Sequence, residues 1–104
     1  MGEAGNSGSS AERKRLEIAL RGTDPDRVLE RARAVPDLGL RDALTIAAFL
    51  AQHDDARADR AGARLLARIL EARPLGIEEA DVVYELVRRL PDPAAVAELR
   101  RFVA

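Results

Sequence analysis

The chain has 104 residues, which suits one small domain and leaves no room for both a core and a deep cleft in a second lobe. Charged residues make up 34% of the chain but nearly cancel, so the formal net charge of −1 excludes the strong positive field that non-specific binding to nucleic acid or an anionic membrane requires. Cysteine is absent, which excludes a disulfide framework, a thiolate nucleophile and a Cys-type zinc site, and fits a cytoplasmic location.

The composition favours helices. Ala and Leu supply most of the apolar side chains, whereas aromatic residues contribute only 3% of the chain. Helices packed through small residues suit this composition better than a β-sheet does, and no segment alternates apolar and polar residues as a strand would. The sequence therefore predicts an all-α fold of five to six short helices, arranged as a compact antiparallel bundle or as a short stack of helical hairpins.

Residues 1–10 are rich in Gly and Ser and nearly free of apolar side chains. They predict a flexible tail, because no burial there would offset the entropy cost of ordering the backbone. The tail also has neither the basic nor the apolar region of a secretory signal. Residues 11–104 are expected to form a single helical domain, in which the first helix runs from Ala11 to about Arg21 with Ser10 as its N-cap.

The second and third helices have clear local signals. Thr23-Asp24-Pro25 is a strong helix start, because Thr or Asp can cap and Pro suits the first turn. The helix should end at Val35, since the residue before Pro36 avoids the α region. The third helix, about residues 41–52, contains the uncharged run 43–51. This run is apolar almost all round, which predicts a helix covered by the others.

Three further helices are predicted, at about residues 56–72, 77–90 and 94–102. The first of them has a core-facing stripe of Leu65, Leu66, Ile69 and Leu70. Gly62 in the same helix indicates the close approach of another helix. The next should bury Ala80, Val83, Tyr84, Val87 and Leu90. The last has apolar residues at Val96, Leu99, Phe102 and Val103.

Two segments separated by 37 positions share a pattern: Leu38-Gly39-Leu40-x-x-Ala43 and Leu75-Gly76-Ile77-x-x-Ala80. With these segments aligned, residues 24–104 resemble helical-repeat proteins of the HEAT or armadillo kind. The resemblance implies stacked units of a helix, a turn and a second helix. The alternative is a compact six-helix antiparallel bundle, similar in size and helix count to the death-fold adaptor family.

Arginines form the best candidate binding surface. Four of them follow one another at spacings of three, four and four residues along the fourth helix, so they should form one cationic stripe, and two more end the fifth helix. Like charges at this spacing repel by a few tenths of a kcal/mol. We expect this repulsion to be compensated by the acids of the fifth helix, by Asp59 and Glu71 of the fourth helix, or by an external anionic partner. The candidate partner-binding residues are Arg57, Arg60, Arg64, Arg68, Arg88 and Arg89.

Other residues give little sign of chemistry. His53 is the sole histidine, and although Asp54 and Asp55 follow it, a metal site needs more ligands than this cluster offers. We expect a histidine at a helix C-terminus followed by capping acids. The carboxylates of residues 78, 79 and 81 should stabilise a helix N-terminus. The chain has no phosphate-binding loop and no serine nucleophile elbow, so we expect no enzymatic activity, no cofactor and no metal.

The sequence thus predicts a non-catalytic adaptor or regulatory domain that presents a helix face to another protein or to a second copy of itself. The alternative is a nucleic-acid-associated regulator that uses the stripe of Arg57, Arg60, Arg64 and Arg68. Nucleic acid is the less expected partner, because no aromatic residues are interleaved with the stripe. Neither a membrane nor a small-molecule substrate is expected.

Overall fold

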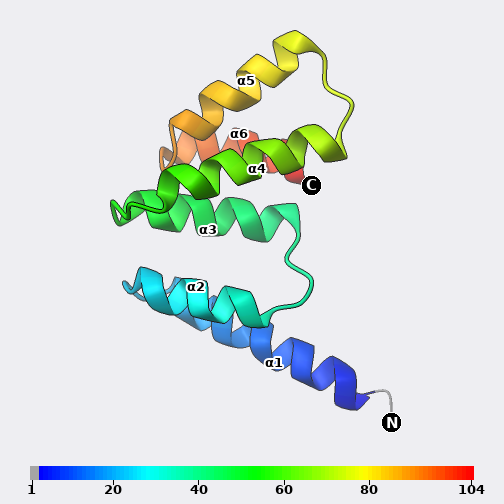
Figure 1. Cartoon of the computed structure of the whole chain (residues 1–104), viewed down its shortest axis with the longest axis vertical. Helices are drawn as coiled ribbons and strands as arrows, with labels where there is room; N and C mark the ends of the chain where they lie inside the picture. The colour runs from blue at the N-terminus through cyan, green and yellow to red at the C-terminus, as the bar shows by residue number, and fades with distance from the viewer. Residues whose placement is uncertain (1–2) are drawn as a thin grey trace. The chain divides into compact units, whose positions relative to one another are not determined.

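The computed structural model describes residues 3–104, with side chains from Ser10 onward, and this part of the chain forms helices and connections without a strand (Figure 1). Its helices are α1 Glu3–Leu20, α2 Pro25–Ala34, α3 Leu40–Gln52, α4 Ala58–Ala72, α5 Ile77–Arg88 and α6 Pro93–Val103. The predicted all-α fold is confirmed. None of the helices in this part of the chain combines the length and the apolar character that crossing a bilayer requires.

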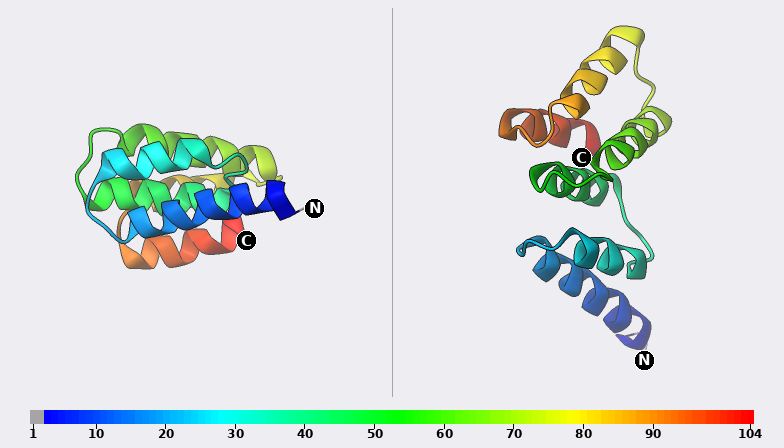
Figure 2. Two further views of the ribbon diagram at one scale, coloured as in Figure 1. Left: turned by 90° about the horizontal axis from the view of Figure 1, so that it is seen from below. Right: turned by 60° about the vertical axis from the view of Figure 1, so that its left-hand side comes forward.

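The chain divides into two compact units, one up to Leu38 and the other from Gly39 to Ala104. In the first unit, α1 and α2 lie side by side as a hairpin (Figures 1 and 2). The second unit is a bundle of α3 to α6. That residues 11–104 form a single domain stays a prediction.

Helix α1 begins earlier than predicted, at Glu3 instead of Ala11. A helix that has already been nucleated gains one hydrogen bond for each residue it adds, so the turns before Ser10 can extend the helix that follows them. The flexibility of residues 1–10 stays a prediction, and the first two of these residues lie outside the described part of the chain.

Local signals set both ends of α2 as predicted. The carboxylate of Asp24 accepts a hydrogen bond of 3.0 Å from the backbone N–H of Asp26, and Pro25 occupies the first turn. At the other end, Val35 is extended at φ −89° and ψ 116°, as the residue before a proline should be. Arg13 of α1 donates to the carbonyl oxygen of Asp37 at 2.9 Å, which ties the connection after α2 back to α1.

The second unit is a closed ring of helices, since each of α3 to α6 packs on the next and α6 packs back on α3. A small aliphatic core lies inside the ring. Its buried side chains are Leu44, Ala47, Leu65, Ile69, Val83, Leu86, Ala95, Leu99 and Val103. The bundle form of the predicted fold therefore describes this unit.

Helix α3 is covered on several sides, as its uncharged run predicts. Leu44 and Ala47 belong to the aliphatic core, and Ile46, Phe49 and Leu50 are buried as well. Successive residues of a helix are rotated by about 100°, so these five positions occupy most of its circumference. No other helix in the described part of the chain has as many buried residues.

Two apolar positions predicted to be in the core are exposed. Leu70 is 42% exposed and Tyr84 is 47% exposed, whereas Leu86, which was not predicted, is buried. The apolar stripes of α4 and α5 are wider than the faces that the ring covers, so residues at their edges remain in solvent. Periodicity locates the stripe but does not show which edge is covered.

Helices α3 and α5 begin with the same capping arrangement. Gly39 precedes α3, and its N–H donates to Oδ2 of Asp42 at 3.1 Å. Gly76 precedes α5, and its N–H donates to Oε1 of Glu79 at 3.2 Å. In both cases a side chain in the first turn reaches back to the residue before the helix, which is one half of a capping box.

The connection between α3 and α4 is a tight corner. The N–H of Asp55 donates to the carbonyl of Leu50 at 3.0 Å, and the N–H of Asp54 donates to that of Ala51 at 3.2 Å. These two bonds form a Schellman motif, in which the residue after the cap adopts the left-handed conformation. Asp54 has φ 51° accordingly, although it is not a glycine.

Gly62 lies where α4 and α5 approach closely, as the sequence predicts. The residue is buried, and a Cβ atom added to it would lie 3.1 Å from Cγ1 of Val87. Glycine in the middle of a helix costs about 1 kcal/mol relative to alanine. The close approach is the structural reason why this helix has a glycine there.

We predict that the corner tolerates Asp54→Gly but not Asp54→Val. Glycine adopts a positive φ without strain, whereas a β-branched residue there should lower the free energy of unfolding by about 1–2 kcal/mol. The side chain of Asp54 is exposed, so neither change removes a core contact. Urea unfolding of both variants and the wild type measures the difference, and equal stability of the two variants would contradict it.

We predict that Gly62→Ala and Val87→Ala are coupled. Alanine at position 62 should be more favourable by about 1 kcal/mol when Val87 has been truncated, because the Cβ then has space. The four proteins of this double-mutant cycle, compared by urea unfolding, test this. Additive effects would show that Val87 moves aside without cost.

Candidate functional site

All six candidate arginines lie in the second unit and are exposed. Four of them belong to α4 or precede it by one residue, as the spacing predicts. They differ in their surroundings, however, because some are already engaged by neighbouring acids. The structure therefore reduces the number of candidate arginines that have no acidic partner.

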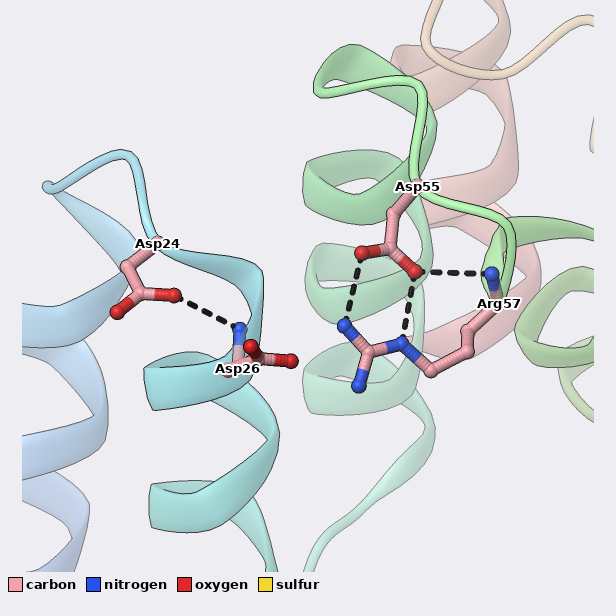
Figure 3. A network of polar contacts seen from close by, with 4 residues as sticks. All are labelled: Asp24, Asp26, Asp55 and Arg57. Carbon is pink, nitrogen blue, oxygen red and sulfur yellow. Dashed lines mark hydrogen bonds and ion pairs between the residues drawn. The ribbon is translucent and has the colours of Figure 1, made fainter.

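Arg57 is engaged by Asp55 (Figure 3). Its Nε and Nη2 atoms each donate to one carboxylate oxygen of Asp55 at 2.8 Å, and its backbone N–H donates to Oδ1 at 2.8 Å. Asp55 therefore holds the backbone of Arg57, the residue before α4, and also binds its guanidinium group in a bidentate pair. The sequence argument missed this pair, although an acid two residues before Arg57, at a helix start, was the available signal.

The contact with Arg57 lowers the pKa of Asp55 from its usual value of 3.8 to about 2. The side-chain hydrogen bond from Arg57 is the main cause, and the backbone hydrogen bond adds to it. Both favour the ionised carboxylate. Figure 3 also shows Asp24, the N-cap of α2 in the first unit, whose carboxylate accepts from the backbone N–H of Asp26.

Arg60 and Arg64 are exposed on the first half of α4, one helical turn apart. No residue in the described part of the chain forms an ion pair or a hydrogen bond with either side chain. Neither the acids of α5 nor Asp59 and Glu71 of α4 form an ion pair with these two arginines, so the predicted compensation by acids of the chain is not seen in its described part. Two cations one turn apart therefore face solvent.

Arg88 and Arg89 are paired within their own segment. Arg88 lies 3.6 Å from the carboxylate of Glu85, with its guanidinium carbon 5.7 Å from the centre of the Tyr84 ring. Arg89 lies 3.4 Å from Asp92. Exposed pairs of this kind contribute little, typically about 0.2–1 kcal/mol. Both residues stay accessible, but part of their charge is already balanced.

An apolar groove of about 210 Å³ lies between α4 and α5. Figure 1 shows the two helices converging towards the end of α5, and the groove lies at this end. We call it the α4–α5 groove. Small side chains form much of its lining, which comprises Ala47, Ala51, Ala58, Gly62 and Ala63 together with larger residues from both helices. Its two charged lining residues are Asp59 and Arg88.

The arginine stripe and the groove are on different sides of α4. Groove-lining positions of α4 are residues 58, 59, 62, 63 and 66, and none of Arg57, Arg60, Arg64 and Arg68 is among them. At about 100° per residue, Arg60 and Arg64 project away from the groove. The arginine stripe and the α4–α5 groove are therefore two separate surfaces.

His53 has a structural position. It is the C-cap of α3, and its ring lies 4.3 Å from that of Phe49, centre to centre. The predicted histidine at a helix C-terminus is confirmed. Among the side chains that the structure describes, from Ser10 onward, no group of three or more metal-ligating residues is close enough to hold an ion.

Comparison with known proteins finds no matching family model, no matching curated protein and no matching solved structure.

We predict that Asp55 makes the fold sensitive to acid between about pH 4 and pH 2. The folded carboxylate stays ionised in this range while the unfolded one binds a proton, so unfolding takes up a proton and stability falls as the pH is lowered. Asp55→Asn keeps an oxygen that accepts from the backbone of Arg57 but cannot titrate, and Arg57→Gln removes the guanidinium group that is the main cause of the lowered pKa. Thermal unfolding from pH 6 to pH 2 should show a stability advantage of the wild type over both variants that disappears in acid. An advantage that stays constant over this range would contradict the prediction.

Proposed function

We propose that this chain is a non-catalytic interaction domain that binds an acidic surface of another protein through Arg60 and Arg64. The observation that carries the proposal is that these two cations are exposed, adjacent on one helix face and without a partner in the described part of the chain. Arginine is well suited to this role, because its planar fork binds a carboxylate in a bidentate manner.

The energetics of α4 support the proposal. Arg60 and Arg64 repel each other by a few tenths of a kcal/mol at their i, i+4 spacing. A carboxylate bound between them would remove this repulsion, and complementary charges at an interface also accelerate association. The bidentate pair of Arg57 with Asp55 illustrates the geometry that such an acidic partner could adopt.

A non-catalytic role is supported by how the reactive side chains are used. The chain has no cysteine, and its sole histidine caps α3 beside Phe49. The carboxylate with the clearly lowered pKa, Asp55, is bound to the side chain and backbone of Arg57, so it is held ionised instead of being poised to transfer a proton.

We predict that Arg60→Glu combined with Arg64→Glu reduces partner capture by at least about tenfold, because like charges would then oppose an acidic surface. The tagged full chain serves as bait, and captured proteins are quantified by mass spectrometry. The melting temperature should not fall, since neither side chain has a partner in the described part of the chain. The control is Arg100→Glu with Arg101→Glu on the exposed side of α6, which lowers the net charge equally. Because Arg101 lies 3.8 Å from Glu98, the melting temperature of the control is measured as well.

Unchanged capture by the α4 variant would remove this surface from consideration, as would an equal loss in the control. Nuclease treatment and a salt titration test whether the ligand is nucleic acid instead of a protein. If it is, capture disappears after nuclease treatment, and binding falls steeply as the salt concentration is raised.

A further inference from the structure

The exposed apolar side chains of the second unit are concentrated on two helices. In the described part of the chain, its exposed large hydrophobic residues are Leu70 on α4 and Ile77, Val82 and Tyr84 on α5. Tyr84, which is 47% exposed, also lines the α4–α5 groove. Of these four residues Tyr84 is the one that lines the groove, since Leu70 lies near the end of α4 and Ile77 begins α5, away from the groove.

The charges of the groove are arranged as an opposite pair. Asp59 lines it from α4, and Arg88 lines it from α5. No ion pair joins Asp59 to another residue in the described part of the chain, and the contact of Arg88 with Glu85 is exposed and long at 3.6 Å. A partner that fits this groove must present a base towards α4 and an acid towards α5.

We propose that the partner is a second copy of this chain and that the α4–α5 groove is the contact surface of a symmetric dimer. A twofold axis running along the groove would set α4 of each copy against α5 of the other, because such an axis exchanges the two walls. Asp59 of each copy would then face Arg88 of the other. The groove of one copy thus presents the acid and the base that the groove of the other copy requires, as the self-complementary surface of an isologous interface must.

The apolar part of the groove fits the same arrangement. The α4 wall includes the small and accessible residues Ala58 and Ala63, whereas the α5 wall contains the half-exposed ring of Tyr84. Facing α4 with α5 would place the ring of each copy against the small residues of the other. Tyrosine is among the residues that most often supply binding energy at interfaces. This surface is distinct from Arg60 and Arg64, so the two proposals can fail independently.

The test is sedimentation velocity of the full chain from micromolar to sub-millimolar concentration. We expect the wild type to dimerise and each of Asp59→Arg and Arg88→Asp to dimerise at least about tenfold more weakly, because each variant opposes like charges twice. Mixing the two variants in equal amounts should restore a dimer, since each reversed charge then meets an opposite one. A variant that combines both changes should also dimerise.

Three outcomes would overturn the proposal: a wild type that stays monomeric throughout, single variants that dimerise as well as the wild type, and an equimolar mixture that stays monomeric. Circular dichroism establishes that each variant is folded. Should a charge reversal prevent folding, Ala63→Tyr, which fills the groove, replaces it. Ala67→Tyr is its matched control, because Ala67 is exposed on the same helix but does not line the groove. Equal dimerisation of these two variants would also overturn the proposal.

Discussion

The second unit depends on packing four helices around a core made only of aliphatic side chains. The nine buried residues of this core include no aromatic ring, so their side chains fill little volume and the helices must approach closely to exclude water. Leu65 and Ile69 are completely buried, and truncating either to alanine would cost about 2–5 kcal/mol. Gly62 is consistent with the same constraint, because a Cβ at this position of α4 would lie 3.1 Å from Val87 of α5 and would require that side chain to move.

Close packing around an aliphatic core leaves the charged residues on the outside of the helices. The two proposed binding surfaces are therefore shallow. The ring of helices buries one stripe of each helix, and no buried polar or charged side chain occurs in the described part of the chain. Polar contacts are therefore found at caps, such as that of Asp24, in the connection with Asp55 and Arg57, and on exposed faces, such as that of Arg60 and Arg64. Binding a partner through complementary surface charge requires no deep site, which is consistent with the proposed function.

The features that the sequence predicted well are those that depend on neighbouring residues. The start of α2 at Asp24 and its end before Pro36 follow from local hydrogen bonding and sterics. Tyr84 was placed wrongly, because its exposure depends on the distance between α4 and α5 and not on helical period. The HEAT or armadillo resemblance stays a proposal. Gly39 and Gly76, 37 positions apart, precede helices that begin with the same cap, and α3 to α6 form a closed ring.

The corner between α3 and α4 shares one residue between two helices. The N–H of Asp55 donates to the carbonyl of Leu50 at the end of α3, and its carboxylate accepts from the backbone N–H of Arg57, the residue that precedes α4. A longer connection would separate these two contacts, so the length of the chain at this corner helps to set the spacing between the two helices.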